Sequence, residues 1–167
     1  YAGSAAGSGP LVCANENTSG VTVTLTSLGL TQILNPDWDP TATLPGPRTI
    51  PRDYGFGSVE GQVTLDGVPL TITRWTNSEI DVSIPPGAST GTLMVNRGDT
   101  GIDTEIGVTL NVVDCASTQI IRVPGNFPTI QQAIDAAVYT PDAPGALILV
   151  APGTYNENLI MYKPVRL

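Results

Sequence analysis

Residue types alternate between positions 21 and 113, and this alternation constrains the fold more than any other feature. The segment "VTVTLTSL" at 21–28 alternates Val or Leu with Thr, which is the period-two pattern of a half-buried strand. In "SEIDVSIPPG", Ile80, Val82 and Ile84 share one face before two prolines end the strand. Two later runs, "GTLMVNRGDTG" and "EIGVTLNVV", indicate further strands. Short strands at this spacing, with no helical periodicity among them, predict a small antiparallel sandwich in a mainly β chain.

Glycine and proline mark the connections. Asp66 and Gly67 lie between two strand runs and predict a tight type I′ hairpin, because that turn needs positive φ at both positions. The segment 35–51, "NPDWDPTATLPGPRTIP", holds five prolines and predicts a long irregular loop. Residues 1–19 open with the small, uncharged "YAGSAAGSGP", which has the composition of a linker. We therefore expect a linker over 1–19 and a β domain over 20–115.

Composition excludes several classes of partner. With 41% hydrophobic and 13% charged residues, the chain is typical of a folded, strand-rich protein rather than a disordered one. The net charge is −8 and Lys163 is the only lysine, so no cationic stripe is available for a nucleic acid. An anionic membrane surface is disfavoured for the same reason. No run of about 18 apolar residues occurs, so we expect no membrane insertion.

The two cysteines, Cys13 and Cys115, bracket the whole β block. A disulfide between them would join the entrance of the domain to its exit, and chain-entropy models assign about 4.7 kcal/mol to a closed loop of about 100 residues. Two unrelated buried thiols are the alternative. Neither cysteine belongs to a CxxC pair, so zinc or thioredoxin-like chemistry is not indicated. A disulfide predicts an oxidising compartment, meaning a secreted or cell-surface protein.

The pattern changes after Cys115, where "STQIIRV" predicts one more strand. Thr129 followed by Gln132 forms a capping box and predicts a helix over about 129–138, ended by Pro141. "ALILV" then predicts a strand buried on both sides, and "APGTYNENLIM" and "PVRL" predict further short strands. The apolar face of the expected helix consists of Ile130, Ala133, Ile134, Ala137 and Val138.

One stretch resembles a known β-sandwich family. "DYGFGSVEGQVTLDGVPLTITRWTNSEIDVSIPPGASTGTLMVNRGD" is similar to an IPT/TIG domain, an immunoglobulin-like β-sandwich. The resemblance rests on the Gly55-Phe56-Gly57 turn, the hairpin over Asp66 and Gly67, Trp75 followed by "SEIDVSIP", and the closing "GASTGTLMVNRG". It covers roughly residues 20–113 and departs from the family in the proline-rich insertion before the turn. It implies a spacer or binding module that rarely carries catalytic groups.

A second stretch, "FPTIQQAIDAA…ALILVAPGTYNENLIM", resembles the start of a right-handed parallel β-helix of the pectate-lyase-like superfamily. The resemblance implies that 116–167 form a capping helix and a first coil. A solenoid buries its core only by stacking coils, and about three repeats are needed for stability. We therefore expect an open apolar face beneath Leu167, covered by the rest of the same polypeptide or by a neighbouring subunit.

The chain contains no histidine, which removes Ser-His-Asp and Cys-His catalysis and the usual zinc and copper ligand sets. Carboxylates are the remaining candidates. Asp37 and Asp39 flank Trp38, an arrangement in which the indole could stack on a sugar while the acids accept its hydroxyls. The alternative is a tryptophan that plugs the edge of the sandwich, with solvated acids beside it. These three residues are the candidate weak ligand contacts, and carbohydrate is the candidate ligand.

Two further groups of residues suggest weaker possibilities. Asp99, Asp103 and Glu105 have an oxygen-ligand spacing loosely suited to a weak calcium site, with a solvated turn as the alternative. Residues 97–99 spell the integrin-type Arg-Gly-Asp triplet, which is common in turns. Glu157 could suggest a lyase acid, but the β-helix resemblance places it in the first coil, whereas those enzymes carry catalysis on later coils.

A glycosylation sequon, Asn17-Thr18-Ser19, would be a surface signal only in a eukaryotic host. No catalytic residue, cofactor or catalytic metal site is predicted. The sequence favours a non-catalytic structural, adhesion or assembly module of a larger secreted or cell-surface bacterial protein. The alternatives are the N-terminal part of a carbohydrate-active, polysaccharide-lyase-like β-helix protein, or an accessory region of a secreted multicopper-oxidase-type protein. Sequence before Tyr1 and after Leu167 would discriminate among them.

Overall fold

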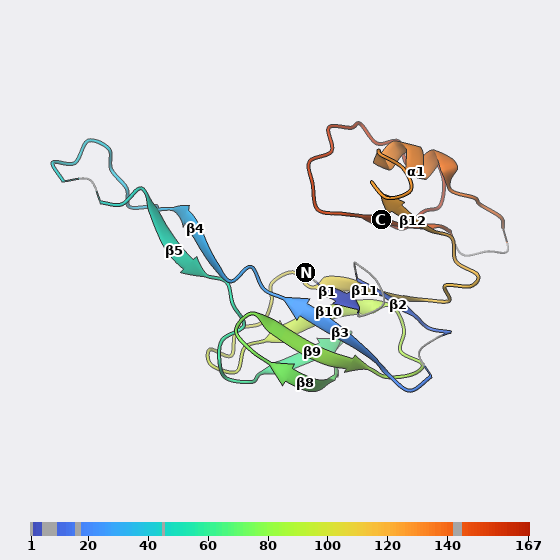
Figure 1. Ribbon diagram of the computed structural model, residues 1–167, viewed down its shortest axis with the longest axis horizontal. Helices are drawn as coiled ribbons and strands as arrows, with labels where there is room; N and C mark the ends of the chain where they lie inside the picture. The colour runs from blue at the N-terminus through green and yellow to red at the C-terminus, as the bar shows by residue number, and fades with distance from the viewer. Residues whose placement is uncertain (1, 5–9, 16–17, 45, 142–144) are drawn as a thin grey trace.

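A computed structural model describes residues 2–4, 10–15, 18–44, 46–141 and 145–167. The chain is mainly β, with 38% of residues in strands and 5% in helix, and none of the sheets formed by the described residues is closed. Figure 1 shows three parts: a two-sheet body, an arm that projects from it, and a ladder segment that carries helix α1. The arm is residues 30–53, the ladder segment is residues 119–167, and the body is formed by the strands of two larger sheets.

The body consists of two sheets built almost entirely of antiparallel pairs. The first sheet has the order β1 (Ala2–Ser4), β3 (Val21–Thr26), β9 (Glu79–Ile84) and β8 (Thr71–Trp75). The second has the order β2 (Leu11–Cys13), β11 (Val108–Val113), β10 (Gly91–Asn96), β6 (Gln62–Leu65) and β7 (Val68–Pro69). Only the β2–β11 pair in these sheets is parallel, within the part of the chain that the structure describes.

The main core lies between these two sheets. The alternation in β3 turns Val23 inward, and the predicted inward face of β9 is confirmed, because Ile80, Val82 and Ile84 are all fully buried. Burial of each such side chain is worth about 1.5–3 kcal/mol relative to exposure. The residues that meet them from the second sheet include Val12, Val63, Leu65, Leu93 and Leu110.

Two local predictions for the body are confirmed. Asp66 and Gly67 have φ of 47° and 79°, the positive values that a type I′ turn requires, and they join β6 to β7. Cys13 and Cys115 form a disulfide with an S–S distance of 2.03 Å. The bond links the end of β2 to the segment after β11, so the covalent link closes the body where the ladder segment begins.

The prediction of a linker over 1–19 is wrong for two segments. Strand β1 pairs with β3, and β2 pairs with β11. Strand pairing uses backbone groups, so small residues such as Ala2 and Gly3 can add to an existing sheet without an apolar pattern of their own. Asn17 of the sequon and Tyr1 lie outside the described residues.

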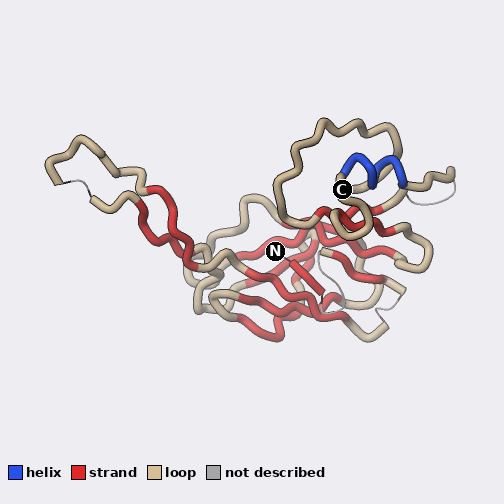
Figure 2. Tube along the Cα trace, turned by 45° about the horizontal axis from the view of Figure 1, so that its top comes forward, coloured by secondary structure: helices blue, strands red, loops and turns tan. Residues whose placement is uncertain are grey.

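The proline-rich segment is only partly an irregular loop, which corrects the second prediction for this region. Strand β4 (Leu30–Leu34) pairs with β5 (Thr49–Asp53) in an antiparallel hairpin, and Pro51 lies within β5. Both strands of a two-stranded ribbon are edge strands, where a proline is tolerated. Figures 1 and 2 show this arm extending away from the body.

The ladder segment contains a parallel pair, an arrangement in which two strands are commonly joined through a helix. Strand β12 (Ile120–Val123) pairs in parallel with β13 (Leu147–Val150). Helix α1 (Ile130–Ala136) begins at Thr129, whose side chain accepts the backbone N–H of Gln132, so the predicted cap is confirmed. Ala133 and Ile134 are buried, as expected.

The predicted end of the helix is wrong. Ala137 is the C-cap with an extended backbone, so the helix ends before Val138 and not at Pro141. The backbone N–H of Val138 donates to the side-chain oxygen of Gln119, and this contact with a neighbouring segment replaces another helical turn. Val138 is 64% exposed and does not belong to the apolar face.

The predicted strands after Val150 are also largely wrong. Residues 151–164 form no strand, and only Arg166 makes a ladder contact, an isolated parallel bridge to Leu147. "ALILV" is buried on both sides as predicted at its start, where Leu147 and Ile148 are almost fully buried. Val150 is 37% exposed, so the prediction does not hold to the end of the strand.

The two faces of the parallel pair serve different cores. Ile121, Val123 and Ile148 pack with helix α1, whereas Leu147 packs with Leu11 and Val113 of the body. This alternation explains why β13 is apolar on both faces. The ladder segment therefore packs directly against the edge of the body formed by β2 and β11. No helix among the described residues is long and apolar enough to cross a membrane.

Candidate functional site

A third stretch of chain, at Arg166, pairs with β13 on the side opposite to β12. Leu147 pairs with Ile120 on one side and with Arg166 on the other. The N–H of Arg166 donates to the carbonyl of Ala146 at 2.9 Å, and the N–H of Ile148 donates to the carbonyl of Arg166 at 2.8 Å. By this register, the next residue, Leu167, falls beside Ile148.

One edge of this ladder is open. In a parallel ladder, a residue directs its N–H and C=O to the same neighbouring strand, and the next residue directs them to the opposite side. Arg166 uses both groups toward β13, so those of Val165 and Leu167 point away, where no further strand lies within the described chain. Leu167 is 56% exposed, whereas Ile148 is 1% exposed. We call the backbone and side chains of 165–167 the open edge.

The loop before the open edge is fastened to both ends of helix α1. The two carboxylate oxygens of Glu157 accept the N–H groups of Ile130 and Gln131 at 3.0 and 2.9 Å. At the other end, the ammonium of Lys163 donates to the carbonyls of Asp135 and Ala137. A negative charge at the N-terminal end and a positive charge at the C-terminal end both match the helix dipole.

A second set of contacts fixes the middle of the same loop. The side chain of Gln131 accepts the N–H of Ile160 and donates to Asp135, and the hydroxyl of Tyr162 also donates to Asp135. These hydrogen bonds lower the pKa of Asp135, and the same contact raises the pKa of Tyr162. The sequence did not predict these contacts between the loop and helix α1, which we call the clamp. It joins residues 26 to 29 positions apart, mostly through side-chain-to-backbone contacts, which leave no periodic signal, although the only lysine of the chain takes part.

A groove with a volume of about 740 Å³ lies beside the open edge, between the ladder segment and the body. Most of its lining is apolar, and Leu167, Ile148 and Val108 all contribute to it. The exposed apolar surface at Leu167 therefore extends into this groove.

The candidate carbohydrate contacts lie on the loop at the tip of the arm. Trp38 lies on the connection between β4 and β5 and is not among the residues packed against the core of the body. The guanidinium of Arg48 lies over the indole, 5.3 Å from its centroid. Asp39 accepts hydrogen bonds from the hydroxyl and N–H of Thr41, which lower its pKa. The N–H of Asp37 donates to the side chain of Asn35.

The candidate calcium ligands are not brought together. Asp99 receives two hydrogen bonds from Arg97, at 3.0 and 2.7 Å, and these lower its pKa. Asp103 instead accepts from Asn96, and Glu105 is exposed. No group of three His, Cys, Asp or Glu side chains able to hold a metal occurs in the described part of the chain. Within the Arg-Gly-Asp triplet, Arg97 and Asp99 form an ion pair with each other.

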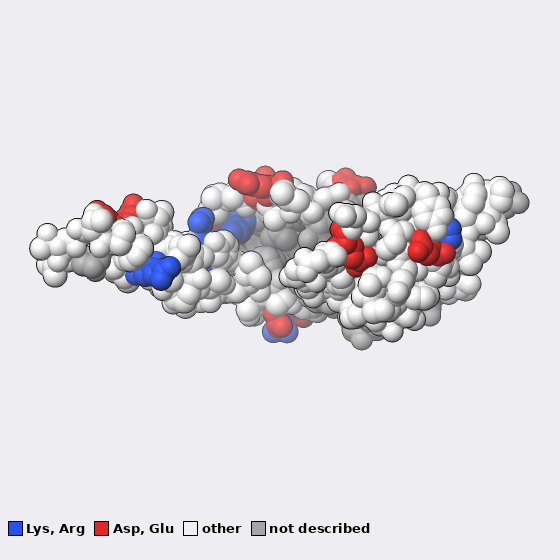
Figure 3. Space-filling model, turned by 90° about the horizontal axis from the view of Figure 1, so that it is seen from above, with Lys and Arg blue, Asp and Glu red and all other residues white. Residues whose placement is uncertain are grey.

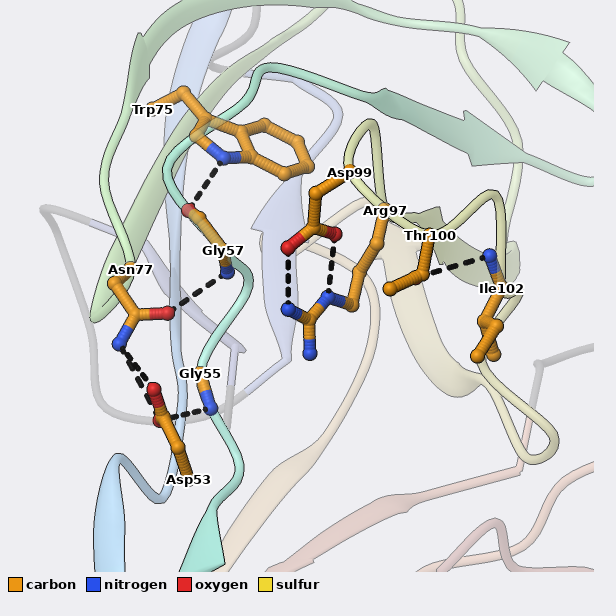
Figure 4. Close-up of polar contacts among 9 residues, drawn as sticks. All are labelled: Asp53, Gly55, Gly57, Trp75, Asn77, Arg97, Asp99, Thr100 and Ile102. Atoms are coloured by element: carbon orange, nitrogen blue, oxygen red, sulfur yellow. Dashed lines mark hydrogen bonds and ion pairs between the residues drawn. The ribbon is translucent and has the colours of Figure 1, made fainter.

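A polar network fixes the base of the arm against the body, as Figure 4 shows. Asp53, the last residue of β5, accepts from the side chain of Asn77 and from the N–H of Gly55. Asn77 in turn accepts the N–H of Gly57, and the indole N–H of Trp75 donates to the carbonyl of Gly57. Gly57 has φ of 80°, which glycine adopts without strain. The arm is thereby held in a defined direction at its base.

Comparison with known proteins adds no relative: no family model, curated protein or solved structure matches this chain.

Proposed function

We propose that this chain is a non-catalytic structural and assembly module of a larger secreted or cell-surface bacterial protein. In this proposal the body is an immunoglobulin-like sandwich of the IPT/TIG type, and the ladder segment is the capped first coil of a right-handed parallel β-helix. The open edge carries the proposal: its function is to receive the next strand of a growing parallel ladder.

The order of the strands supports an immunoglobulin-like body. In constant-type immunoglobulin domains, strands A, B, E and D form one sheet, and strands C, F and G form the other. The order β1-β3-β9-β8 corresponds to A-B-E-D, and β11-β10-β6 corresponds to G-F-C. The arm then becomes an insertion between strands B and C. An insertion there leaves both sheets intact, which agrees with the arm projecting from the body (Figure 1).

The chemistry of the open edge supports a strand as its occupant. Unpaired N–H and C=O groups in a row can pair with another strand, and the geometry at 165–167 calls for a parallel one. Covering Leu167 and the neighbouring groove would bury apolar surface, at roughly 25 cal/mol per Å². The occupant that fits both requirements is a further coil, supplied by more of the same polypeptide or by a neighbouring subunit.

Two other observations agree with this role. The disulfide between Cys13 and Cys115 favours an oxidising compartment, such as the cell surface or extracellular space. Glu157, the acid that would be considered for a lyase, has both carboxylate oxygens engaged by the helix. That engagement favours a structural role over the polysaccharide-lyase alternative.

The proposal is tested with the full chain and two leucine substitutions. Leu167→Lys places a charge at the open edge, and Leu44→Lys is the matched control, because Leu44 is 91% exposed on the arm. We expect sedimentation velocity to show concentration-dependent association of the wild type, reduced in Leu167→Lys and unchanged in Leu44→Lys. A wild-type chain that stays monomeric at high concentration, with the amides of Val165 and Leu167 protected from hydrogen exchange, would show that the coil closes by itself.

A further inference from the structure

Asn111 is a polar residue at the contact between the body and the ladder segment. Strand β11 directs Leu110 into the main core, and Val112 packs against that core. Because side chains alternate along a strand, Asn111 lies on the opposite face, together with Val113. On that face Val113 packs with Leu147 of the ladder segment. Asn111 therefore lies next to an apolar contact between the two parts of the molecule.

The side-chain amide of Asn111 is almost enclosed, yet it makes no hydrogen bond. Asn111 is only 9% exposed, and it lines the groove between the ladder segment and the body. Its backbone N–H donates to the carbonyl of Pro10, but no described residue forms a hydrogen bond with its side chain. In the described part of the chain, every fully enclosed side-chain nitrogen or oxygen has a partner. The amide of Asn111 therefore still meets solvent, and the groove that it lines holds that solvent.

An amide in this position lowers the stability of the free chain. A polar group that loses most of its hydration without gaining a hydrogen bond is unfavourable. The neighbours of Asn111 on this face are apolar: Leu11 lies opposite in the β2–β11 register, and Val113 lies two residues along. Proteins accept such a local cost mainly at positions that serve a function. The donor and acceptor of this amide are available to a bound partner.

We propose that Asn111 selects an extended polypeptide strand as the occupant of the groove. A side-chain amide carries both a donor and an acceptor, so it can pair with the C=O and the N–H of a peptide backbone. The mostly apolar walls of the groove suit the side chains of such a strand. This inference rests on the proposed function, because Leu167 belongs both to the open edge and to the groove. It adds that the strand received by the ladder also contacts the body.

Charge does not select this occupant. Arg122 is the only charged residue that lines the groove within the described chain. Figure 3 shows the charged groups of the molecule in small, separate clusters, with uncharged surface between them. Hydrogen bonding and apolar packing are therefore the interactions that would hold a strand in the groove.

The ladder of a second copy of this chain offers no free strand for this position. The N–H of Arg122 in β12 donates to the side-chain oxygen of Asn126 at 2.8 Å, and its carbonyl accepts the N–H of Asn126 at 2.6 Å. A turn thus occupies the edge of β12 that faces away from β13. Strand β13 itself is paired on both sides, with β12 and with Arg166. The strand that we infer at Asn111 is therefore not β12 or β13 of a second copy.

The test uses the full chain and a labelled synthetic peptide, "GALILVAPG", which copies residues 145–153 and carries two added lysines for solubility. This segment already pairs with β12 on one side and with Arg166 on the other, so it has the properties of a ladder strand. Fluorescence anisotropy measures its affinity. Asn111→Leu should weaken binding about tenfold, because backbone groups of the peptide lose their partner. Leu167→Lys should also weaken binding, because it places a charge at the open edge.

The stability of the free chain separates a binding role from a structural one. Asn111→Leu should raise the melting temperature by about 2–4 °C, because it removes an unpaired amide from apolar surroundings. Thr109→Val is the matched control, since Thr109 lies two residues earlier on the same face and also lines the groove. It should bind the peptide as the wild type does. Asn111→Ala removes the amide without adding volume, and it provides the same measurement if the leucine variant does not fold.

Four results would overturn the inference. A lower melting temperature in Asn111→Leu would show that the amide stabilises the free chain. Equal binding by the wild type and Asn111→Leu, with weaker binding by Leu167→Lys, would remove Asn111 but leave the proposed function intact. Equally tight binding of a peptide with proline in place of Leu149 would show that any apolar chain fills the groove, because proline has no backbone N–H to donate. Absence of peptide binding would also end the inference, and sedimentation of Leu167→Lys would then decide the proposed function separately.

Discussion

The two-sheet body and the ladder segment are built from similar aliphatic residues, but they complete their cores differently. In the body, Val82 of one sheet and Val63 of the other are both fully buried between paired sheets. In the ladder segment, Ile148 is buried while Leu167, in register with it, is 56% exposed. Two facing sheets can cover each other within one domain, whereas each coil of a parallel ladder covers only its neighbours. The body therefore covers its own core between two sheets, whereas a parallel coil is covered only by an adjacent coil.

The two regions also hold their loops differently. The body uses short turns such as the one at Asp66 and Gly67, where backbone conformation alone suffices. The ladder segment uses charged side chains, with Glu157 and Lys163 fastening one loop to opposite ends of helix α1. The ladder segment should therefore respond more strongly to changes of charge, and the body to changes of volume.

The largest effect should come from the covalent link between the two regions. We expect Cys13→Ser with Cys115→Ser to lower the free energy of unfolding of the body by about 4 kcal/mol, because the bond closes a loop with a sequence separation of 102. Urea denaturation with and without reductant measures this effect. Reductant should destabilise the wild type and leave the double variant unchanged. A wild type insensitive to reductant would mean that the bond contributes nothing to stability.

A pair of core substitutions compares the two cores directly. Ile80→Ala should cost about 3–4 kcal/mol, because it leaves a cavity between two sheets. Ile148→Ala should cost about 2 kcal/mol, since Ile148 lines the groove and the space left behind opens to water. Denaturation followed by hydrogen exchange assigns each loss to its region. Equal costs would contradict the view that the space left at Ile148 opens to water.

A glycine substitution should disrupt the pairing of Arg166 with β13. A Cβ at Gly145 would collide with the carbonyl oxygen of Pro164, whereas one at Gly46 would meet no atom within 4 Å. We expect Gly145→Ala to cost about 1–3 kcal/mol locally and to speed hydrogen exchange at Ile148 and Arg166. Gly46→Ala should change neither. Unchanged exchange in Gly145→Ala would argue against pairing at Arg166.

Removing the charge that caps helix α1 should have a smaller effect. Glu157→Gln weakens two charge-assisted hydrogen bonds to helix N–H groups, so we expect a loss of about 1 kcal/mol in the ladder segment. Glu105→Gln is the control for charge, because that side chain is exposed. Thermal denaturation of both variants measures the difference. Equal effects would indicate that the loop is not fastened through Glu157.

The smallest effect should be the pH dependence of the same clamp. Hydrogen bonds from Gln131 and Tyr162 hold the pKa of Asp135 below its usual range, so the folded form binds the proton less readily than the unfolded form. The stabilisation is present above the ordinary aspartate pKa, near pH 4, and is lost as pH falls through the lowered value. Hydrogen exchange of residues 157–163 between about pH 6 and pH 3 should show this loss. Asp135→Asn should make the dependence shallower, and an unchanged slope would remove Asp135 from the clamp.

Much of the body could be predicted because its signals are local. The alternation around Ile80 and Val82 indicates which face of the sheet each side chain occupies. The residues Asp66 and Gly67 indicate a turn, because both positions need positive φ. For the candidate site, the sequence predicts an open apolar face at Leu167. It does not predict the clamp through Glu157, because that carboxylate meets helix N–H groups only after the loop has folded back.

The sequence by itself determined the faces of the strands, the start of helix α1 at Thr129, and a pair of cysteines that bracket one domain. Only the tertiary structure decided that residues 2–4 would add a strand, that the proline-rich segment would form an arm, and that 151–164 would leave the ladder. The physical reason is that periodicity encodes the burial of a segment but not the identity of its partner. Partners are chosen by backbone and side-chain contacts between distant positions, which exist only once the chain has folded.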